Sequence, residues 1–365
     1  MAKHIWFSGA TDVTGNTLAE SLKLNGTRTK PQNLKNGDVV VCWGTKTKEN
    51  VNFPNGVKVL NHPDKIRINR NKFESLKVMA ANDHLKDAIA KFCAANEITQ
   101  KLNGKAMSLP LVARKKYHQG GKGFWLCLTK QHVQKAIEDG AEYFQDYVGI
   151  DTEYRLHVMF GNVIYAVKKV ENPNEQGWIN QRKEKVKDYA KKNDVELDEN
   201  TLDYVLKRLA KEAVLPDRIV RSNKRGWKFS GVRLANVPAA VKNAAVKAVE
   251  IAGLDFGAVD CAKGLDGNPY IIEINSGPGL QGTALQKYVD AFTKKIKDLE
   301  FVKKVEDLEK PGPVEKAANA VLGAVGAAKA DEELDINDEA LVHLMNAVKN
   351  PEEARRVLDL MAKNK

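Results

Sequence analysis

The chain has 365 residues, of which 43% are hydrophobic and 29% are charged, so it can bury a core and form two or three structural units. Its formal net charge of +11 favours anionic partners, which could be nucleotides, nucleic acid, an acidic polypeptide or a membrane surface. The four cysteines form no CxxC pair, which argues against a disulfide framework and a thiolate zinc site. No secretion signal is visible, and no apolar run approaches the length of about 20 residues that a membrane span needs, so we expect a soluble cytoplasmic protein without a membrane partner.

The N-terminal segment predicts a small α/β layer. Strands are expected in "HIWFSGA", "DVVVCWG" and "GVKVLN", and a helix in "NTLAESLKLNG" between the first two strands. The polar stretch "FSGATDVTG" joins the first strand to this helix. We interpret it as an ordinary connection in preference to a ligand-binding loop.

The middle of the chain begins with a helix in "NRNKFESLKVMAAND", followed by "SLPLVARKKYHQGGKGFWLCL", which predicts two strands around a glycine-rich turn. By itself this turn allows phosphate binding, nucleic-acid binding or a simple change of direction. Residues 171–219 are rich in both charge signs and predict an exposed helical insertion, whose lysines could also contact an acidic partner. Beyond residue 310 a Pro/Gly break precedes a helical tail suited to packing, oligomerisation or docking.

The stretch "GAVDCAKGLDGNPYIIEIN" predicts a hairpin with two acids on one face. A two-residue turn at Asp266 and Gly267 places Asp260 opposite Glu273. Their β-carbons would be about 5 Å apart, which costs stability unless a cation lies between them. Asn275 shares the face of Glu273 and adds an amide oxygen. These hard ligands indicate a Mg²⁺ or Mn²⁺ site bridged to phosphates; ordinary surface acids are the less favoured reading, because both acids sit in apolar runs.

Two further segments gather cations. In "EYRLHVMFGNVIYAVKKV" a tight turn at the GN dipeptide would place Arg155 opposite Lys168, which suggests an anion between them, although cations that point into water fit nearly as well. In "IVRSNKRG" Arg221 and Asn223 lie on one strand face. An arginine fork there fits a carboxylate or a reactive phosphate.

Taken in order, "NRNK", "PLVARKKYHQGGKG", "YFQDYV", "VRSNKRG", "GAVD" and "EINSGPGLQG" resemble the ATP-grasp superfamily, and within it the ribosomal-protein glutamate ligases. The matching features run from about residue 66 to residue 295, and "EINSGPGLQG" with the upstream "VD" is the most specific part. The resemblance implies an α+β and α/β architecture, an ATP-grasp fold with an N-terminal α/β domain and a C-terminal helical tail. Its expected parts are an N-terminal domain over 1–68, a small subdomain with a glycine-rich lid over 69–145, a large subdomain with a helical insertion over 146–308, and a linker and tail over 309–365.

The resemblance also implies an activity, that of an ADP-forming carboxylate-amine ligase. Such an enzyme uses ATP and Mg²⁺ or Mn²⁺ to form an amide-type bond through an acyl phosphate, and a homo-oligomer is common among its relatives. The carboxylate and amine substrates stay open, and one of them could be an acidic protein or a nucleic acid. The net charge of +11 keeps an alternative in view, a nucleic-acid-binding protein that uses the fold without ligase activity.

Motif by motif, the resemblance implies that Asp260, Glu273 and Asn275 hold Mg²⁺, while Arg221 and Asn223 lie at the acyl-phosphate centre. The implied nucleotide contacts comprise a phosphate-side lysine, a hinge that meets adenine, an acid that holds the ribose, and a lid of backbone N–H groups over the triphosphate. The corresponding residues are Lys72; Gln145, Asp146, Tyr147 and Val148; Glu153; and Gly120, Gly121, Lys122 and Gly123.

Two features depart from the family pattern. Arg114 stands in "VARKK" where the family usually has a lysine, and its planar guanidinium is not equivalent to a lysine point charge. Lys115 or Lys116 could therefore take that place. The insertion over 171–219 is the second departure, and it could shape a substrate entrance.

Overall fold

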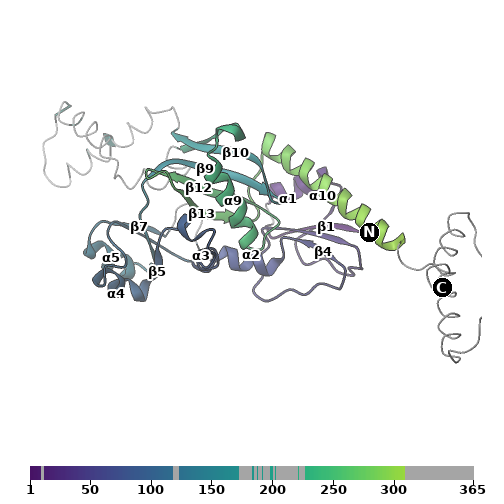
Figure 1. Ribbon diagram of the computed structural model, residues 1–365, viewed down its shortest axis with the longest axis horizontal. Coiled ribbons are helices and arrows are strands. Elements are labelled where there is room, and N and C mark those ends of the chain that lie inside the picture. The colour runs from purple at the N-terminus through teal and green to yellow at the C-terminus, as the bar shows by residue number, and fades with distance from the viewer. Residues whose placement is uncertain are drawn as a thin grey trace, which may run out of the picture. The chain divides into compact units, whose positions relative to one another are not determined.

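The computed structural model describes most of the chain as far as the end of a long helix at residue 308, and it divides into two compact units, Met1–Thr293 and Lys294–Lys365 (Figure 1). The tip of the glycine-rich lid, most of the predicted insertion and the predicted tail lie outside the described residues, and the predicted domain boundaries stay a prediction. Within the described part, no helix combines the length and the apolar character that a membrane crossing requires. The described residues are 1–9, 12–117, 123–171 and 227–308, with single positions at 183, 184, 187, 191, 198, 199, 202 and 221.

The N-terminal strands form a parallel sheet in the order β2-β1-β3-β4. All residues of β3 are buried, as expected for an apolar strand covered on both faces of a parallel sheet. The predicted strand-helix-strand unit is confirmed, and Asp12 caps the helix by accepting a hydrogen bond from the Gly15 N–H. The short, mostly exposed β2 had no hydrophobic signal and was not predicted. The bounds are β1 (Lys3–Phe7), α1 (Val13–Ser21), β2 (Asn25–Thr27), β3 (Val39–Trp43) and β4 (Lys58–Leu60).

A second sheet is antiparallel, with the order β5-β8-β6-β7. Its β6 and β7 are the two strands predicted around the glycine-rich turn. Leu111 and Ala113 of β6 pack into a core with residues of α4 and α5, so Arg114 lies on the opposite face of the sheet. The bounds are β5 (Phe92–Ala94), α4 (Ile98–Asn103), β6 (Leu111–Arg114), β7 (Phe124–Cys127), α5 (Lys130–Glu138) and β8 (Tyr143–Asp146).

The third and largest sheet is antiparallel, in the order β11-β10-β9-β12-β13, and α9 packs across β9, β12 and β13 (Figure 1). Leu156, Val158 and Val259 point into this helix-covered core. Because side chains alternate along a strand, the residues between them face the other side. The bounds are α2 (Pro63–Arg70), α3 (Lys72–Ala80), β9 (Ile150–Met159), β10 (Asn162–Glu171), β11 (Trp227–Gly231), α9 (Ala239–Ile251), β12 (Phe256–Gly264), β13 (Pro269–Asn275) and α10 (Gly282–Leu308).

The β12–β13 hairpin has the predicted pairing of Asp260 with Glu273, but its turn is wider than predicted. Lys263 pairs with Pro269, so more than two residues make the turn. Asp266 closes this wider turn by accepting hydrogen bonds from the Tyr270 hydroxyl at 2.7 Å and from Asn268. A bulge next to Asp260 then restores the register that the narrow turn would have given.

The β9–β10 hairpin corrects a prediction, because Arg155 pairs with Val167 and not with Lys168. The turn residues are Phe160 and Gly161, with φ values of 51° and 79°, one position earlier than predicted. The Phe160 N–H donates to the Asp255 carbonyl at 2.7 Å, which holds the turn at this position.

Candidate active site

The face of the large sheet opposite α9 carries a row of charged side chains. Glu153 and Arg155 come from β9, and Asp260 and Glu273 from β12 and β13. In the strand registers Asp260 lies between Arg155 on one side and Glu273 on the other. Alternation along the strands thus brings acids and cations from distant parts of the chain to one surface.

Asp260 and Arg155 form a two-pronged ion pair. The Arg155 Nε and Nη2 atoms donate to the two carboxylate oxygens at 2.6 and 2.8 Å. Asp260 is only 5% exposed, so this pair is shielded from water. Both oxygens of a predicted metal ligand therefore already have a cationic partner.

Glu273 has two partners as well. The Lys72 Nζ lies 2.8 Å from its Oε2, and the Asn275 side-chain amide donates to its Oε1 at 3.1 Å. Lys72 begins α3, and its N–H donates to the Lys116 carbonyl at 2.9 Å. Burial disfavours the charged form of Glu273, but the Lys72 ammonium and these hydrogen bonds outweigh burial and lower its pKa to about 2.

Glu153, the predicted ribose ligand, is 4% exposed and pairs with Lys169 of β10. Burial raises the pKa of Glu153, and the Lys169 ammonium offsets only part of that rise. Lys168, the predicted anion ligand, is exposed and pairs with Tyr154 and Ser230 in the sheet. The predicted pairing of Arg155 with Lys168 fails because the two lysines are adjacent and only the register decides which one joins the charged face.

Aromatic rings of β11 border the charged face. The Arg155 guanidinium lies 4.6 Å from the centre of the Phe229 ring, and the Arg221 guanidinium lies 4.8 Å from that of Trp227. Arg221 also donates to the Ile150 carbonyl at 3.0 Å, which places it by the first residue of β9. Asn223, its predicted partner, lies outside the described residues.

Arg114 reaches the same region from the small sheet. Its guanidinium lies 5.5 Å from the centre of the Phe124 ring, and its positive charge helps to lower the pKa of Glu273. The buried Arg114 Nε has no hydrogen-bond partner among the described residues, so it can donate to an incoming anion. The Lys116 ammonium instead lies 5.6 Å from the centre of the Phe73 ring.

The predicted glycine-rich lid is described only at its two ends. The Lys115 N–H donates to the Gly123 carbonyl at 3.2 Å, which continues the pairing of β6 and β7 towards the tip. Gly123 has a φ of 63°, where glycine is favoured. Gly120, Gly121 and Lys122 lie outside the described residues.

The predicted hinge comprises the last two residues of β8 and the two residues that follow it. The Asp146 N–H donates to the Lys91 carbonyl at 2.8 Å and the Tyr147 N–H to the Pro110 carbonyl at 3.1 Å. The Gln145 side chain donates to the Ala90 carbonyl at 3.4 Å. The N–H of Val148, the last residue of the predicted hinge, has no hydrogen-bond partner in the described part of the chain, so it can donate to a nucleotide base.

The charged face offers oxygen donors of the kind that Mg²⁺ prefers in proteins. Among the described residues no three His, Cys, Asp or Glu side chains are grouped to hold a metal, but two carboxylates and one amide lie together. Oxygen donors of Asp260, Glu273 and Asn275 are hard ligands, and they would hold Mg²⁺ if the ion came with further oxygen ligands. The donor set fits this ion better than zinc.

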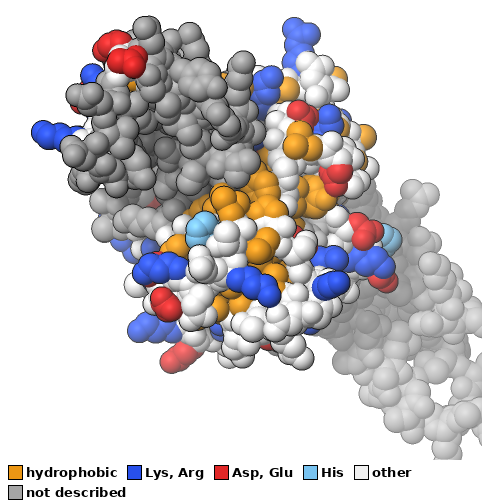
Figure 2. All heavy atoms as spheres, turned by 90° about the vertical axis from the view of Figure 1, so that its left-hand side faces the viewer, with side chains coloured by type: hydrophobic (Ala, Val, Ile, Leu, Met, Phe, Trp, Pro, Cys, Tyr) orange, Lys and Arg blue, Asp and Glu red, His pale blue; other side chains and the backbone are white. Residues whose placement is uncertain are grey.

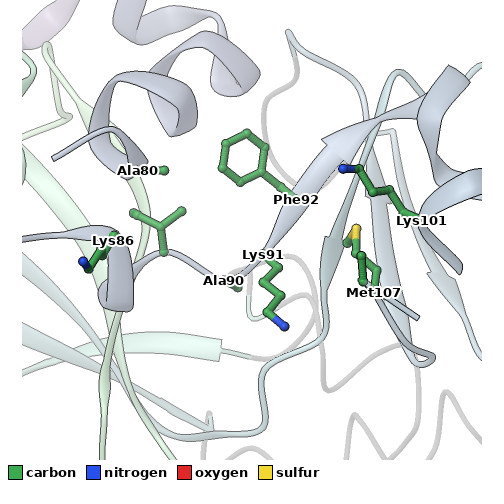
Figure 3. Close-up of a pocket in the computed structure, with 9 residues that line it drawn as sticks. Ala80, Lys86, Ala90, Lys91, Phe92, Lys101 and Met107 are labelled. Atoms are coloured by element: carbon green, nitrogen blue, oxygen red, sulfur yellow. The ribbon is translucent and has the colours of Figure 1, made fainter. Parts of the chain in front are cut away.

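A separate pocket lies at the edge strand β5 of the small sheet. Figure 2 views the molecule from the left of Figure 1 and shows hydrophobic side chains at the surface, with Lys and Arg side chains near them. The pocket measures about 330 Å³, and it contains none of the predicted site residues (Figure 3). Ala80, at the end of α3, lines it, so pocket and charged face lie at opposite ends of that helix. Its other lining residues are Lys86, Ile89, Ala90, Lys91, Phe92, Lys101, Ala106 and Met107.

Few known proteins resemble this chain in sequence. No protein-family profile matches the chain. An uncharacterized protein of Mycoplasma genitalium is 32% identical over 71 residues, which are 19% of this chain and 25% of that protein. The chain thus matches about a quarter of the length of this relative, and the match carries no functional information.

Comparison by structure is more informative. The D-alanine–D-alanine ligase of Bacillus anthracis matches 86% of this chain and 100% of its own, with a TM-score of 0.50 and 13% identity. The ATP-grasp ligase PsnB matches 82% of this chain and 99% of its own, with a TM-score of 0.49 and 11% identity. The chain has the ATP-grasp fold, which confirms the predicted fold class; identities this low show the fold alone.

Proposed function

We propose that this chain is an ADP-forming carboxylate-amine ligase that uses ATP and Mg²⁺. One observation carries the proposal: within an ATP-grasp fold, the buried Asp260 and the partly buried Glu273 and Asn275 share one sheet face beside cations of the protein. Acids and cations gathered on one shielded face cost desolvation even when they are paired, so their presence there needs a reason. Binding a metal-bound triphosphate is the reason that the donor set supports best.

The nucleotide would lie between the small and the large sheet. Lys72 and Arg114 are the proposed phosphate ligands, because both charges act on Glu273 from the small-sheet side. We assign the adenine to the hinge near Val148 and the ribose to Glu153. The glycine-rich lid would close over the phosphates with backbone N–H groups.

In the proposed reaction an oxygen of the substrate carboxylate attacks the γ-phosphorus of ATP, and ADP leaves. The amine then attacks the acyl carbon of the acyl phosphate, phosphate leaves, and the amine loses a proton to solvent. Mg²⁺ would supply charge neutralisation on the phosphates. We assign Arg221 and Asn223 to the acyl-phosphate centre, where the arginine fork would hold the transferred phosphoryl group.

The binding of ATP with Mg²⁺, measured by isothermal titration calorimetry, tests the proposal. We expect a saturable heat for the native protein and its loss in Glu273→Ala. Asp151→Ala is a matched control, because this carboxylate also lies in the large sheet but forms an exposed pair with Lys263. Absence of binding by the native protein to any nucleotide would contradict the proposal.

Phosphate release would identify the substrates. We would incubate the protein with labelled ATP and a panel of amino acids, acidic peptides and nucleic acids, since the net charge of +11 favours an acidic acceptor. A non-catalytic nucleic-acid binder would instead show affinity that falls steeply with salt and is unchanged in Asp260→Ala and Glu273→Ala.

A further inference from the structure

The acids at the centre of the charged face are already neutralised by the protein itself. Arg155 occupies both oxygens of Asp260 at 2.6 and 2.8 Å, and Lys72 lies 2.8 Å from Glu273. The Asn275 side-chain amide donates a hydrogen bond to the other carboxylate oxygen of Glu273 at 3.1 Å. In this state none of the carboxylate oxygens at the centre is without a hydrogen-bond donor.

A free divalent cation would have to displace these internal cations. The side chains of Arg155 and Lys72 are only 22% and 13% exposed. If a metal took their carboxylates, the guanidinium and the ammonium would be left largely buried without an anion, which is strongly unfavourable. A metal ion that arrives alone therefore gains contacts with carboxylates but leaves Arg155 and Lys72 without anionic partners.

A metal that arrives with a triphosphate avoids this cost, because the phosphates offer new anionic partners to the displaced cations. We propose that Arg155 and Lys72 act as exchangeable counter-ions, so that this site binds a divalent metal and a triphosphate together and binds each of them weakly alone. The proposal rests on the proposed function, since it concerns the same ligands. It assigns to Arg155 and Lys72 a role in selecting the metal–nucleotide complex over the free metal.

The surroundings of both cations suit such an exchange. The Arg155 guanidinium lies 4.6 Å from the Phe229 ring centre, a contact that can persist when its anionic partner changes. Lys72 begins α3, and its N–H is bonded to the carbonyl of Lys116, which follows β6 and leads into the glycine-rich segment. Its backbone is thereby held beside Lys116, while its flexible side chain can turn from carboxylate to phosphate.

The test measures Mn²⁺ binding to the native full-length protein by electron paramagnetic resonance, without nucleotide and with a saturating non-hydrolysable ATP analogue. We expect the analogue to tighten Mn²⁺ binding by at least about tenfold. The analogue alone, measured by calorimetry in the presence of a chelator, should gain the same factor from the metal, because binding linkage is reciprocal.

Substitution of each cation tests whether it couples the binding of Mn²⁺ to the binding of the analogue. In Lys72→Met and Arg155→Met we expect Mn²⁺ alone to bind more tightly than in the native protein and the effect of the analogue to shrink. Lys263→Met is the matched control, since it removes a lysine of β12 whose pair with Asp151 is exposed, and its Mn²⁺ binding should be unchanged. Circular dichroism would exclude unfolded variants, and the measurement on the native protein depends on none of them.

The possible results distinguish failure of the counter-ion exchange from failure of the proposed ligase function. Equal Mn²⁺ affinity with and without the analogue, in a native protein that binds the analogue, would overturn the counter-ion exchange and leave the ligase proposal standing. Unchanged Mn²⁺ binding in both folded variants would also overturn it. A native protein that binds neither the analogue nor ATP would instead overturn the proposed function.

Discussion

Glu273 keeps its negative charge far into the acidic range because Lys72 and Asn275 both contact it. Its ordinary pKa of 4.5 falls to about 2 in the folded chain. A carboxylate with a depressed pKa stabilises the fold above its unfolded pKa and loses that contribution as the pH falls through the folded value. We therefore expect the free energy of unfolding to fall between about pH 4.5 and pH 2, by up to about 3 kcal/mol from this group.

Urea denaturation at several pH values would measure this loss. In Glu273→Gln the protein should be less stable at neutral pH, because Lys72 stays buried without its anion, but the loss on acidification should be smaller. Glu153 acts in the opposite direction in a different window, since its pKa is raised by burial and its contribution declines as the pH rises above its unfolded value. Equal acid sensitivity of Glu273→Gln and the native protein would contradict the pKa assigned to Glu273.

The residues at the site differ in how far the sequence alone could identify them. Asp260 and Glu273 stand out because each is an acid inside an apolar run, which is a local signal. Lys169 carries no such signal, because Lys168 beside it is chemically the same and only the pairing of β10 with β9 separates them. The partner of each acid likewise depends on tertiary contacts that no local pattern encodes.

At the scale of elements, the buried apolar strands were predictable, but the short exposed β2 and the turns of the hairpins were not. Apolar runs identified β1, β3, β12 and β13, since burial of a strand is visible in its composition. Turn chemistry then suggested two-residue turns in both large hairpins. In the β12–β13 hairpin the contacts of Asp266 widen the turn, and a bulge then restores the predicted pairing. In the β9–β10 hairpin the contact of Phe160 fixes the turn one position earlier, and the predicted pairing is not restored.

The pairing of β9 with β12 makes a prediction about their ion pair. Because Arg155 and Asp260 are shielded from water, we expect Arg155→Met and Asp260→Asn each to lower the free energy of unfolding by about 3–5 kcal/mol. The double variant should lose clearly less than the sum, because neither charge is then left unpaired. Urea denaturation of the native protein, the two single variants and the double variant gives the coupling free energy between Arg155 and Asp260.

The exposed pair of Lys263 and Asp151 joins the same two strands and serves as the control cycle. Its side chains are 41% and 45% exposed, so the same cycle should give less than about 1 kcal/mol. Similar coupling in both cycles would contradict the view that shielding from water makes the Arg155 pair special.

At the scale of the whole molecule, the N-terminal sheet is fixed to the large sheet within the unit Met1–Thr293. The Trp43 ring stacks on Phe256 with 5.5 Å between ring centres, and the Asn61 side chain donates to the Phe256 carbonyl at 2.9 Å. The Gly44 N–H donates to the Ser276 carbonyl at 3.3 Å, directly after Asn275. The ends of parallel strands, where α/β sheets commonly bind ligands, thus adjoin the proposed metal ligands.

The family resemblance implied the N-terminal α/β domain but not this junction. Gly44 and Gly277 lie far apart in the sequence, and although Gly277 belongs to the specific motif "EINSGPGLQG", nothing in that motif points to Gly44. Their close approach depends on how the two sheets pack. No hydrophobic period or turn rule reports on such packing.

The junction makes a last prediction, because it tolerates no side chain at Gly277. A β-carbon there would lie 2.8 Å from both Cα and N of Gly44, and backbone cannot move aside as a flexible side chain can. We expect Gly277→Ala to lower the free energy of unfolding by about 1–3 kcal/mol and to weaken ATP binding, since the strained loop follows Asn275 directly. Gly279→Ala is the matched control in the same loop, because a β-carbon there meets nothing within 4 Å. Thermal unfolding and calorimetry of both variants would measure the two effects, and equal behaviour of the two would show that the contact between the sheets does not constrain the site.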